Sequence, residues 1–169
     1  AGTLMAGANN SSTTFAGVIQ NGGGPVGLTK VGTGAMTLSG INTYTGTTVV
    51  NEGKLIVDGS IATSSQTTIN AGGTIAGSGT VGNLTINGGT LSPGNSPGTL
   101  TVNGNLVLTA AASYFLEVTP TVADRTNVTG TATLGGATLK ANYAAGTYVA
   151  KQYTIVNATG GVIGTFNGP

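Results

Sequence analysis

Histidine, cysteine and tryptophan are absent from the 169 residues of this sequence. Their absence excludes histidine general bases, zinc sites built from histidine and cysteine, thiol nucleophiles and disulfides. Charged residues are also rare, at 5% of the chain, whereas an average soluble domain has roughly 25%. The longest apolar run is too short for a transmembrane helix, and no segment has the pattern of a signal peptide. We expect no nucleic acid partner, because the five cations are spread along the chain at Lys30, Lys54, Arg125, Lys140 and Lys151.

The acidic residues are too few for the enzyme and calcium sites that are common on repetitive β folds. Glycoside hydrolysis requires two facing carboxylates, and a calcium solenoid requires an aspartate in every repeat. Asp124-Arg125 is most simply an ion pair in a loop or a local structural contact, and Glu52 could face Lys30 or Lys54 across coils. We predict that the chain is not an enzyme, that it has no catalytic, cofactor-binding or metal-binding residue, and that it has no small-molecule substrate. The four acids are Glu52, Asp58, Glu117 and Asp124.

Threonine, valine and isoleucine, which favour extended backbone, are abundant, whereas good helix formers are scarce. Glycine and threonine each occur 31 times and valine and isoleucine are frequent, whereas glutamate occurs twice and lysine four times. No window of ten residues has a helical period, and glycine or Asn-Gly pairs separate short apolar runs. The sequence therefore predicts an all-β fold, with strands at 15–20, 35–39, 47–50, 54–57, 67–70, 84–87, 99–103, 106–109, 114–119, 127–134, 137–141 and 153–157.

A tetrad of the form aliphatic-Asn-x-Gly recurs in the middle of the chain. Its copies are Val50-Asn51-Glu52-Gly53, Ile69-Asn70-Ala71-Gly72 and Ile86-Asn87-Gly88-Gly89, with Val102-Asn103-Gly104 as a looser fourth copy. The asparagines therefore recur at a nearly constant interval, and another strand-like run follows each tetrad. Strands that repeat at this period without helices are typical of a β-solenoid.

In a solenoid, each coil stacks on the next at the inter-strand spacing of ~4.8 Å. Coils of ~16–25 residues predict roughly seven to ten coils and a rod on the order of 35–50 Å long. Aliphatic side chains would point inward, and asparagines at the corners would hydrogen-bond to the equivalent asparagine one coil away. We interpret the tetrads as corner structure and not as a ligand site.

Two further patterns have structural interpretations. The segment 77–82 matches the dinucleotide pattern G-x-G-x-x-G, but a strand and a turn follow it where a helix is required, so we interpret it as a turn between coils. Alternating threonines at 43, 45 and 47 and at 129, 131 and 133 would lie on one face of a strand. Their irregular spacing favours hydrogen-bonded ladders between coils over an ice-binding surface.

Part of the sequence resembles the passenger-associated transport repeat of bacterial autotransporters. The matching residues are Leu28-Thr29-Lys30, Gly32, Gly34, Leu38, Gly40, Asn42-Thr43-Tyr44, Gly46, Thr48, Val50, Gly53, Leu55 and Val57. The segment 91–102 resembles the coil that precedes the C-terminal stem of such passengers. Further segments resemble the autochaperone stem of such passengers. They are Phe115-Leu116-Glu117-Val118, Asp124-Arg125, Val128-Thr129-Gly130, Leu134-Gly135-Gly136, Tyr153-Thr154-Ile155 and the segment 161–166.

This resemblance implies a right-handed, single-stranded parallel β-helix with a C-terminal capping stem. Residues 1–98 would form coils that include the repeat, and residues 99–169 would form the stem in continuity with the same helix. The partner would be the passenger's own C-terminal outer-membrane β-barrel, which is absent from this chain. The expected location is the cell surface or the exterior of a Gram-negative bacterium.

Aromatic residues are concentrated in the expected stem, with two in residues 1–110 and six in residues 111–169. Because aromatic rings bury much apolar area, we expect the stem to fold first and to template the addition of coils toward the N-terminus. The leading function is a non-catalytic stem for folding, export and surface display. The alternative is an adhesin or self-association surface that binds a host cell or a neighbouring passenger.

Overall fold

The computed structural model describes residues 1–95 and 97–168. Ser96 in the segment 91–102 and Pro169, the last residue of the predicted stem, lie outside the described residues. The described residues form short strands joined by turns, and they contain no helix that is long and apolar enough to cross a membrane. The predicted all-β class is therefore confirmed.

The strands belong to three parallel sheets, here named sheets A, B and C. Sheet A contains β1 (Gly2–Ala6), β3 (Val26–Lys30), β5 (Thr48–Val50), β8 (Thr67–Asn70), β11 (Leu84–Asn87), β14 (Leu106–Leu108), β17 (Ala132–Thr133) and β20 (Val162–Ile163). Sheet B contains β2 (Thr13–Phe15), β4 (Ala35–Leu38), β6 (Gly53–Val57), β9 (Gly73–Gly77), β12 (Thr90–Pro93), β15 (Ser113–Val118) and β18 (Thr138–Tyr143). Sheet C contains β7 (Ser60–Ile61), β10 (Thr80–Val81), β13 (Thr99–Val102), β16 (Arg125–Val128) and β19 (Val156–Ala158).

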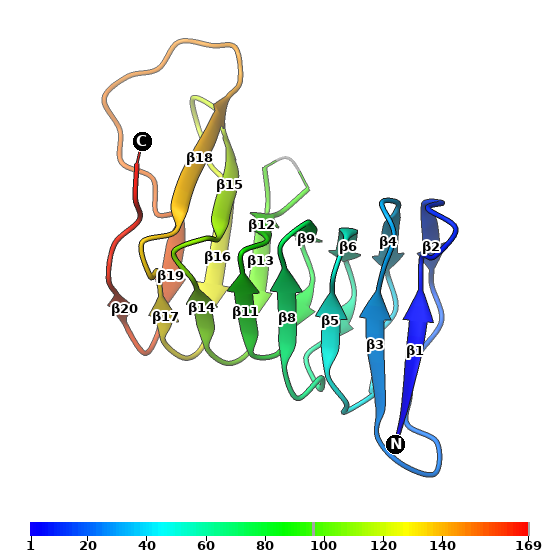
Figure 1. The fold of residues 1–169 in the computed structure, drawn as a ribbon. Coiled ribbons are helices and arrows are strands. Elements are labelled where there is room, and N and C mark those ends of the chain that lie inside the picture. Colours follow the sequence, from blue (N-terminus) through cyan, green and yellow to red (C-terminus); the bar gives the residue numbers. More distant parts are fainter. Residues whose placement is uncertain (96, 169) are drawn as a thin grey trace.

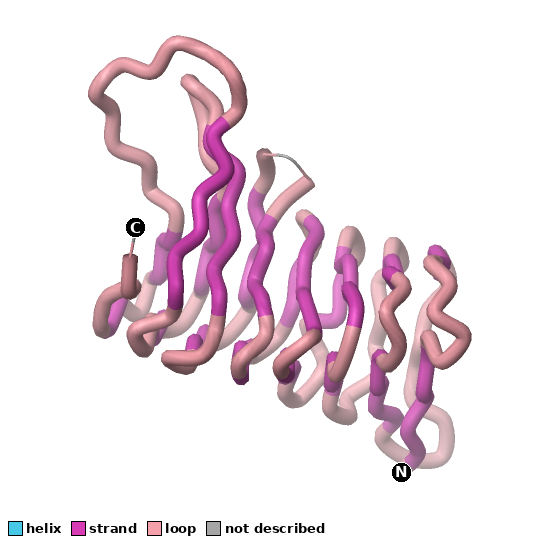
Figure 2. Tube along the Cα trace, turned by 45° about the horizontal axis from the view of Figure 1, so that its top comes forward, coloured by secondary structure: helices cyan, strands magenta, loops and turns pink. Residues whose placement is uncertain are grey.

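The chain winds through the sheets in turn as a right-handed parallel β-solenoid, with its N-terminus at one end of the stack (Figure 1). Along sheet A, Ile69 pairs with Ile86 in the middle of the stack, whereas Ala132 pairs with the much more distant Val162 at the C-terminal end. The coils are thus shortest in the middle and longest at the C-terminal end. There, the long connection that follows β18 projects beyond the body of the solenoid (Figure 2).

The core follows from the alternation of side chains along each strand. Sheet A contributes the column Val50, Ile69, Ile86 and Leu108, whose members pair in register and are buried. Sheet B contributes Leu55, Ile75, Leu91 and Tyr114 in the same way. Sheet C contributes Ile61, Val81, Val102 and Val128. Aliphatic columns therefore run along the interior of the stack.

The corner asparagines stack as predicted for the three full tetrads. Asn70 Nδ2 donates to Asn51 Oδ1 at 2.8 Å, and Asn87 Nδ2 donates to Asn70 Oδ1 at 3.3 Å. The prediction that Asn103 of the looser fourth copy belongs to the same corner was wrong, because Asn103 follows a strand of sheet C and lies at a different corner. Thr109 continues the stack in its place, and its hydroxyl accepts a hydrogen bond from Gly88 N. Coil length, and not the tetrad alone, selects the residue at each corner.

The local predictions were most accurate where coils are shortest. The strands 67–70 and 84–87 were predicted with their observed bounds. The segment 77–82, which matches the dinucleotide pattern, contains the end of β9, a turn and β10, as predicted for a turn between coils. The strand predicted at 127–134 is broken into β16 and β17, so the threonine row at 129–133 crosses a turn. The threonine row at 43–47 lies outside the strands altogether.

Candidate functional site

Six buried polar residues interrupt the otherwise aliphatic core in the N-terminal half of the solenoid. They gather within and directly after the segment 28–57, which has the motif of the transport repeat. We name them the polar core cluster: Lys30, Asn42, Thr48 and Tyr44 from the repeat itself, and Ser64 and Thr67 from the next coil. Each of these side chains is at most 3% exposed, so its polar atoms depend on partners within the protein.

Lys30 occupies a core position, since it pairs with Ala6 on one side and with Val50 on the other. Its ammonium donates to the carbonyl oxygens of Val31 at 2.7 Å, Gly32 at 2.7 Å and Glu52 at 3.3 Å. Burial lowers the pKa of Lys30 below its ordinary value, and the negative charge of Glu52 partly offsets this effect. Lys30 therefore holds two successive corners together through backbone carbonyls.

Asn42 connects three successive coils. Its Oδ1 accepts a hydrogen bond from Ile19 N at 2.9 Å, and its Nδ2 donates to the carbonyls of Gly40 at 3.0 Å and Ser60 at 3.1 Å. Leucine at this position would leave Ile19 N without this partner, at a cost of about 1–3 kcal/mol, whereas Gly40 O and Ser60 O would keep their backbone donors. Asn42 is therefore a specific connector and not a general corner residue.

Tyr44 begins a chain of hydroxyl groups that leads into the next coil. Its hydroxyl lies 2.6 Å from Thr48 Oγ1, which in turn lies 2.9 Å from Ser64 Oγ. Ser64 Oγ also donates to the carbonyl of Gly46 at 3.0 Å. Burial raises the pKa of Tyr44, although the hydroxyl partners lower it in part. In contrast, Thr67 Oγ1 is buried without a partner among the described residues.

A second group of contacts holds the C-terminal coils together. The Tyr114 hydroxyl donates to Ile155 O at 2.7 Å and lies 3.0 Å from Thr126 Oγ1, and the Tyr114 ring stacks on Phe166 with ring centroids 5.3 Å apart. Tyr153 donates to Thr119 O at 2.8 Å. Tyr148 donates to Val118 O at 2.8 Å. The aromatic residues of this part thus bind backbone that is distant in sequence.

The side chains of the two aspartates have structural partners. Asp58 Oδ1 accepts hydrogen bonds from Ser78 N and Asn95 Nδ2. Asp124 is buried, and its carboxylate accepts hydrogen bonds from Gly98 N at 2.7 Å and Glu117 N at 2.8 Å. Burial raises the pKa of Asp124, and these two N–H groups offset part of the increase. Across residues 1–95 and 97–168, no cluster of acids forms a metal site.

Of the two interpretations of Asp124-Arg125, the ion pair was wrong, whereas a structural contact agrees with the backbone hydrogen bonds of Asp124. Consecutive residues at a strand point to opposite faces, so Asp124 turns inward to the backbone and Arg125 turns outward to solvent. Glu52 does lie close to Lys30, whose pKa is lowered by burial and raised in part by the negative charge of Glu52. Lys30 contacts the backbone carbonyl of Glu52 and not its carboxylate.

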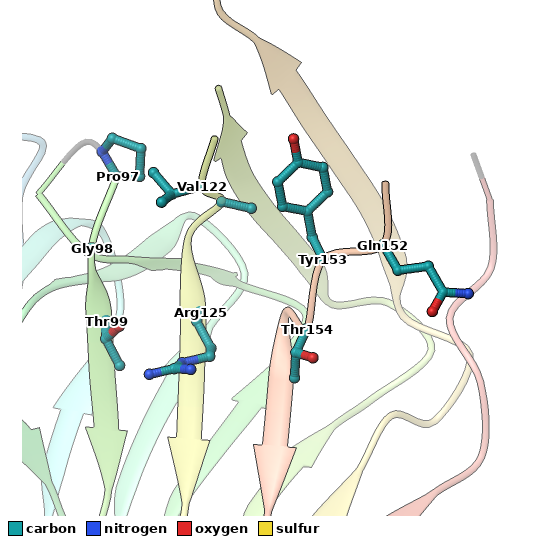
Figure 3. Close-up of a pocket in the computed structure, with 9 residues that line it drawn as sticks. Pro97, Gly98, Thr99, Val122, Arg125, Gln152, Tyr153 and Thr154 are labelled. Carbon is teal, nitrogen blue, oxygen red and sulfur yellow. The ribbon is translucent and has the colours of Figure 1, made fainter. Parts of the chain in front are cut away.

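Arg125 lies in an open groove on the outer face of sheet C, which we name the Arg125 groove (Figure 3). Its volume is about 410 Å³. The guanidinium group extends toward β13 and Thr99, while Thr154 lies on its other side. The lining residues are Pro97, Gly98, Thr99, Val122, Ala123, Arg125, Gln152, Tyr153 and Thr154.

Comparison with known proteins connects this architecture to secretion. Residues 28–57 match the family model of the passenger-associated-transport-repeat. A stretch of 76 residues, 44% of this chain, is 43% identical to the adhesin BmaC autotransporter of Brucella suis biovar 1 (strain 1330). The chain thus contains this repeat and is similar to part of an autotransporter passenger, and we refer to it as the passenger segment. Two extracellular serine proteases of Serratia marcescens are 52% and 48% identical to the passenger segment over 56 residues, 33% of this chain.

The passenger segment spans only 2% of the Brucella adhesin and 5% of each Serratia protease. The predicted location at the surface or exterior of a Gram-negative bacterium is confirmed. The structure also explains the repeat motif. Its aliphatic positions are core residues, its Lys30, Asn42 and Thr48 belong to the polar core cluster, and Tyr44 supplies the connecting hydroxyl.

Sequence reasoning missed the polar core cluster and the Arg125 groove. The motif that contains Lys30 and Asn42 was recognised, but burial of a lysine at a core position has no local sequence signal. Thr67 and Ser64 are ordinary threonine and serine in a chain that is rich in both. The groove depends on Thr99, Arg125 and Thr154, which belong to three successive coils and meet only through stacking.

Proposed function

We propose that this passenger segment is a non-catalytic β-helical stem that supports folding, export and surface display. The observation that carries this proposal is the uninterrupted stack of sheet A. Each strand of this sheet, from β1 at one end to β20 at the other, is hydrogen-bonded to the next strand of the sheet. Most buried polar side chains are engaged in holding one coil on its neighbour. The chain contains no histidine, so it cannot supply a Ser-His-Asp triad.

We propose further that residues 99–169 form the stem and fold first. The hydroxyl contacts of Tyr114 and Tyr153 and the long pairing of β15 with β18 support this order, because they join the final coils to one another. Once these coils are formed, β13 and β14 offer template edges to the shorter coils on their N-terminal side. The partner of the whole passenger would be its own C-terminal outer-membrane β-barrel.

Two matched substitutions in the full chain test this folding order. Leu116→Ala in β15 and Leu55→Ala in β6 each remove a buried leucine side chain from sheet B. Each is expected to destabilise the protein by about 2–5 kcal/mol. If the stem nucleates folding, Leu116→Ala mainly slows refolding and Leu55→Ala mainly speeds unfolding in stopped-flow measurements.

The reverse assignment of the two rate effects would contradict the template mechanism. A second measurement uses the shorter chain 1–98. After dilution from denaturant, we expect residues 1–169 to regain a β-sheet circular dichroism signal and protease resistance, and residues 1–98 to regain neither. Equal refolding of both chains would show that the stem is not needed as a template.

The second candidate is adhesion or self-association through the side of the rod. The 43% identity to the Brucella adhesin favours it, although the match covers only 2% of that protein. Deletion within the whole passenger separates the two functions. Loss of cell attachment with normal surface display after deletion of this segment would support adhesion, whereas loss of display itself would support the stem function.

A further inference from the structure

Backbone atoms of the Arg125 groove join the coils, but the side chain of Arg125 takes no part in the hydrogen bonds among residues 1–95 and 97–168. We propose that the Arg125 groove binds a sugar that carries a carboxylate, such as a uronic acid in a surface glycan. The proposal rests on the surface display inferred above and identifies the class of ligand that the displayed rod would take. Charge, lining and rigidity support it independently.

The charge in the groove is positive and uncompensated. Arg125 is exposed, and its guanidinium makes no hydrogen bond or ion pair with residues 1–95 or 97–168. The adjacent Asp124 is directed to the other face, where Gly98 N and Glu117 N bind its carboxylate. No acidic residue lines the groove. A guanidinium group with free donors matches a carboxylate, because the two form a pair of parallel N–H···O bonds.

The size and remaining lining favour a sugar acid over a small inorganic anion. Thr99 pairs in register with Arg125, so its hydroxyl lies beside the guanidinium, and Thr154 adds a second hydroxyl (Figure 3). Pro97 and Val122 present apolar surface to the same space. The volume of about 410 Å³ lies within the range of roughly 300–1,000 Å³ for small-ligand sites. Hydroxyl groups, an apolar wall and one cation together match a carboxylated sugar ring.

The walls are held in place before any ligand arrives. Arg125 N donates to Gly98 O at 2.9 Å, which joins the strand of the arginine to the turn before β13. The Tyr153 hydroxyl donates to Thr119 O at 2.8 Å, and Lys151 Nζ donates to Thr121 O at 2.6 Å. These bonds hold the 119–123 connection against residues 151–154. A groove with fixed walls loses little conformational entropy on binding.

The test is a nuclear magnetic resonance titration of the ¹⁵N-labelled chain 1–169 with methyl glucuronide. Methyl glucoside is the neutral control, and sodium sulfate is the inorganic anion. We expect glucuronide to shift the Arg125 Nε–Hε and Thr99 amide signals, with no shift from glucoside at the same concentration. Arg125→Gln should weaken glucuronide binding on the order of tenfold or more.

Lys140→Gln is the matched control, because it removes the same charge from an exposed residue of β18 outside the groove. It should leave the affinity unchanged. Thr99→Val keeps the arginine and should weaken binding by a smaller factor, with folding verified by circular dichroism. Absence of shifts with glucuronide, or equal weakening by Lys140→Gln, would overturn the proposal. Equal affinity for sulfate would overturn the sugar assignment. None of these outcomes alters the refolding test of the stem.

Discussion

At the scale of single residues, buried polar groups determine the register in which adjacent coils stack. A column of valine, isoleucine and leucine offers similar contacts to any neighbouring coil, so apolar burial specifies the stacking register weakly. Asn42 and Thr48 find their partners in adjacent coils only when those coils are placed in one register. Polar residues in a core act in this way when a misplaced partner leaves a buried group unsatisfied.

The buried tyrosines predict a loss of stability in alkali. Burial raises the pKa of Tyr44 and of Tyr114 above the ordinary value of 10.0. Between that value and the folded-state pKa, the folded protein binds more protons than the unfolded chain, so the free energy of unfolding falls as the pH rises. The expected slope is at most about 1.4 kcal/mol per pH unit for each tyrosine. Urea unfolding monitored by circular dichroism between pH 8 and 12 measures it.

Two variants assign this alkaline effect to the phenol. Tyr114→Phe should reduce the slope, whereas Thr126→Val removes only the hydrogen-bond partner and should retain it. Because the chain has no tryptophan, tyrosinate absorbance reports the same ionisation directly. An unchanged slope in Tyr114→Phe would show that this phenol does not control alkaline stability.

At the scale of elements, the turn after each sheet B strand limits how closely coils can stack. Gly40, Gly59 and Gly79 occupy the same corner in three successive coils. A Cβ atom built on each would collide with a backbone carbonyl of the preceding coil: Gly17 O, Gly40 O and Gly59 O, respectively. The abundance of glycine in this chain is thus a packing requirement at this corner, since the backbone cannot move away without opening the ladder.

Gly59→Ala is therefore expected to destabilise the protein by about 1–3 kcal/mol, as overpacking of a close contact does. Gly23→Ala is the matched control, because a Cβ atom there meets nothing within 4 Å and the backbone does not have a positive φ. That control should be neutral or stabilising by up to about 1 kcal/mol, since alanine restricts the unfolded chain. Thermal or urea unfolding of both variants measures the difference. Equal stability of the two would contradict the packing explanation.

At the scale of the whole molecule, burial is uneven along the stack. β1 and β2 expose nearly all of their residues, and Val162 and Ile163 of β20 are about half exposed. The central strands β8 and β9 carry core residues with no exposure, including Ile69 and Ile75. Because each coil contacts only its neighbours, coils at the ends lack half of the contacts that central coils have.

Native-state hydrogen exchange should show this gradient. Amides of β6, β8, β9 and β11 are expected to exchange most slowly, through global unfolding, and those of β1, β2 and β20 most rapidly, through local fraying. The polar core cluster lies close to these slowly exchanging strands, so the backbone amides of Asn42 and Thr48 are expected to be protected from exchange. Uniform protection along the chain would mean that the stack unfolds as a single cooperative unit.

The sequence by itself determined that this protein is an all-β solenoid, because that class follows from local patterns, whereas its right-handed winding was implied by the family resemblance. Alternation of apolar residues with a period of two specifies strands, and Asn and Gly at spaced positions specify corners. For this reason, β8 and β11 were predicted with their observed bounds. The match of residues 28–57 to the transport repeat was likewise readable from residue types and spacing.

Only the tertiary structure decided which side chains meet. Coil lengths vary along sheet A, from the short coil between β8 and β11 to the long coil between β17 and β20, and each change in length brings a different residue to a given corner. The stacking of Asn87 on Asn70 was predicted from the repeat. In contrast, the contact of Thr109 with Gly88, the carbonyl partners of Lys30 and the joining of Thr99 to Arg125 all depend on these lengths. Such contacts connect residues that are distant in sequence, and no local pattern encodes them.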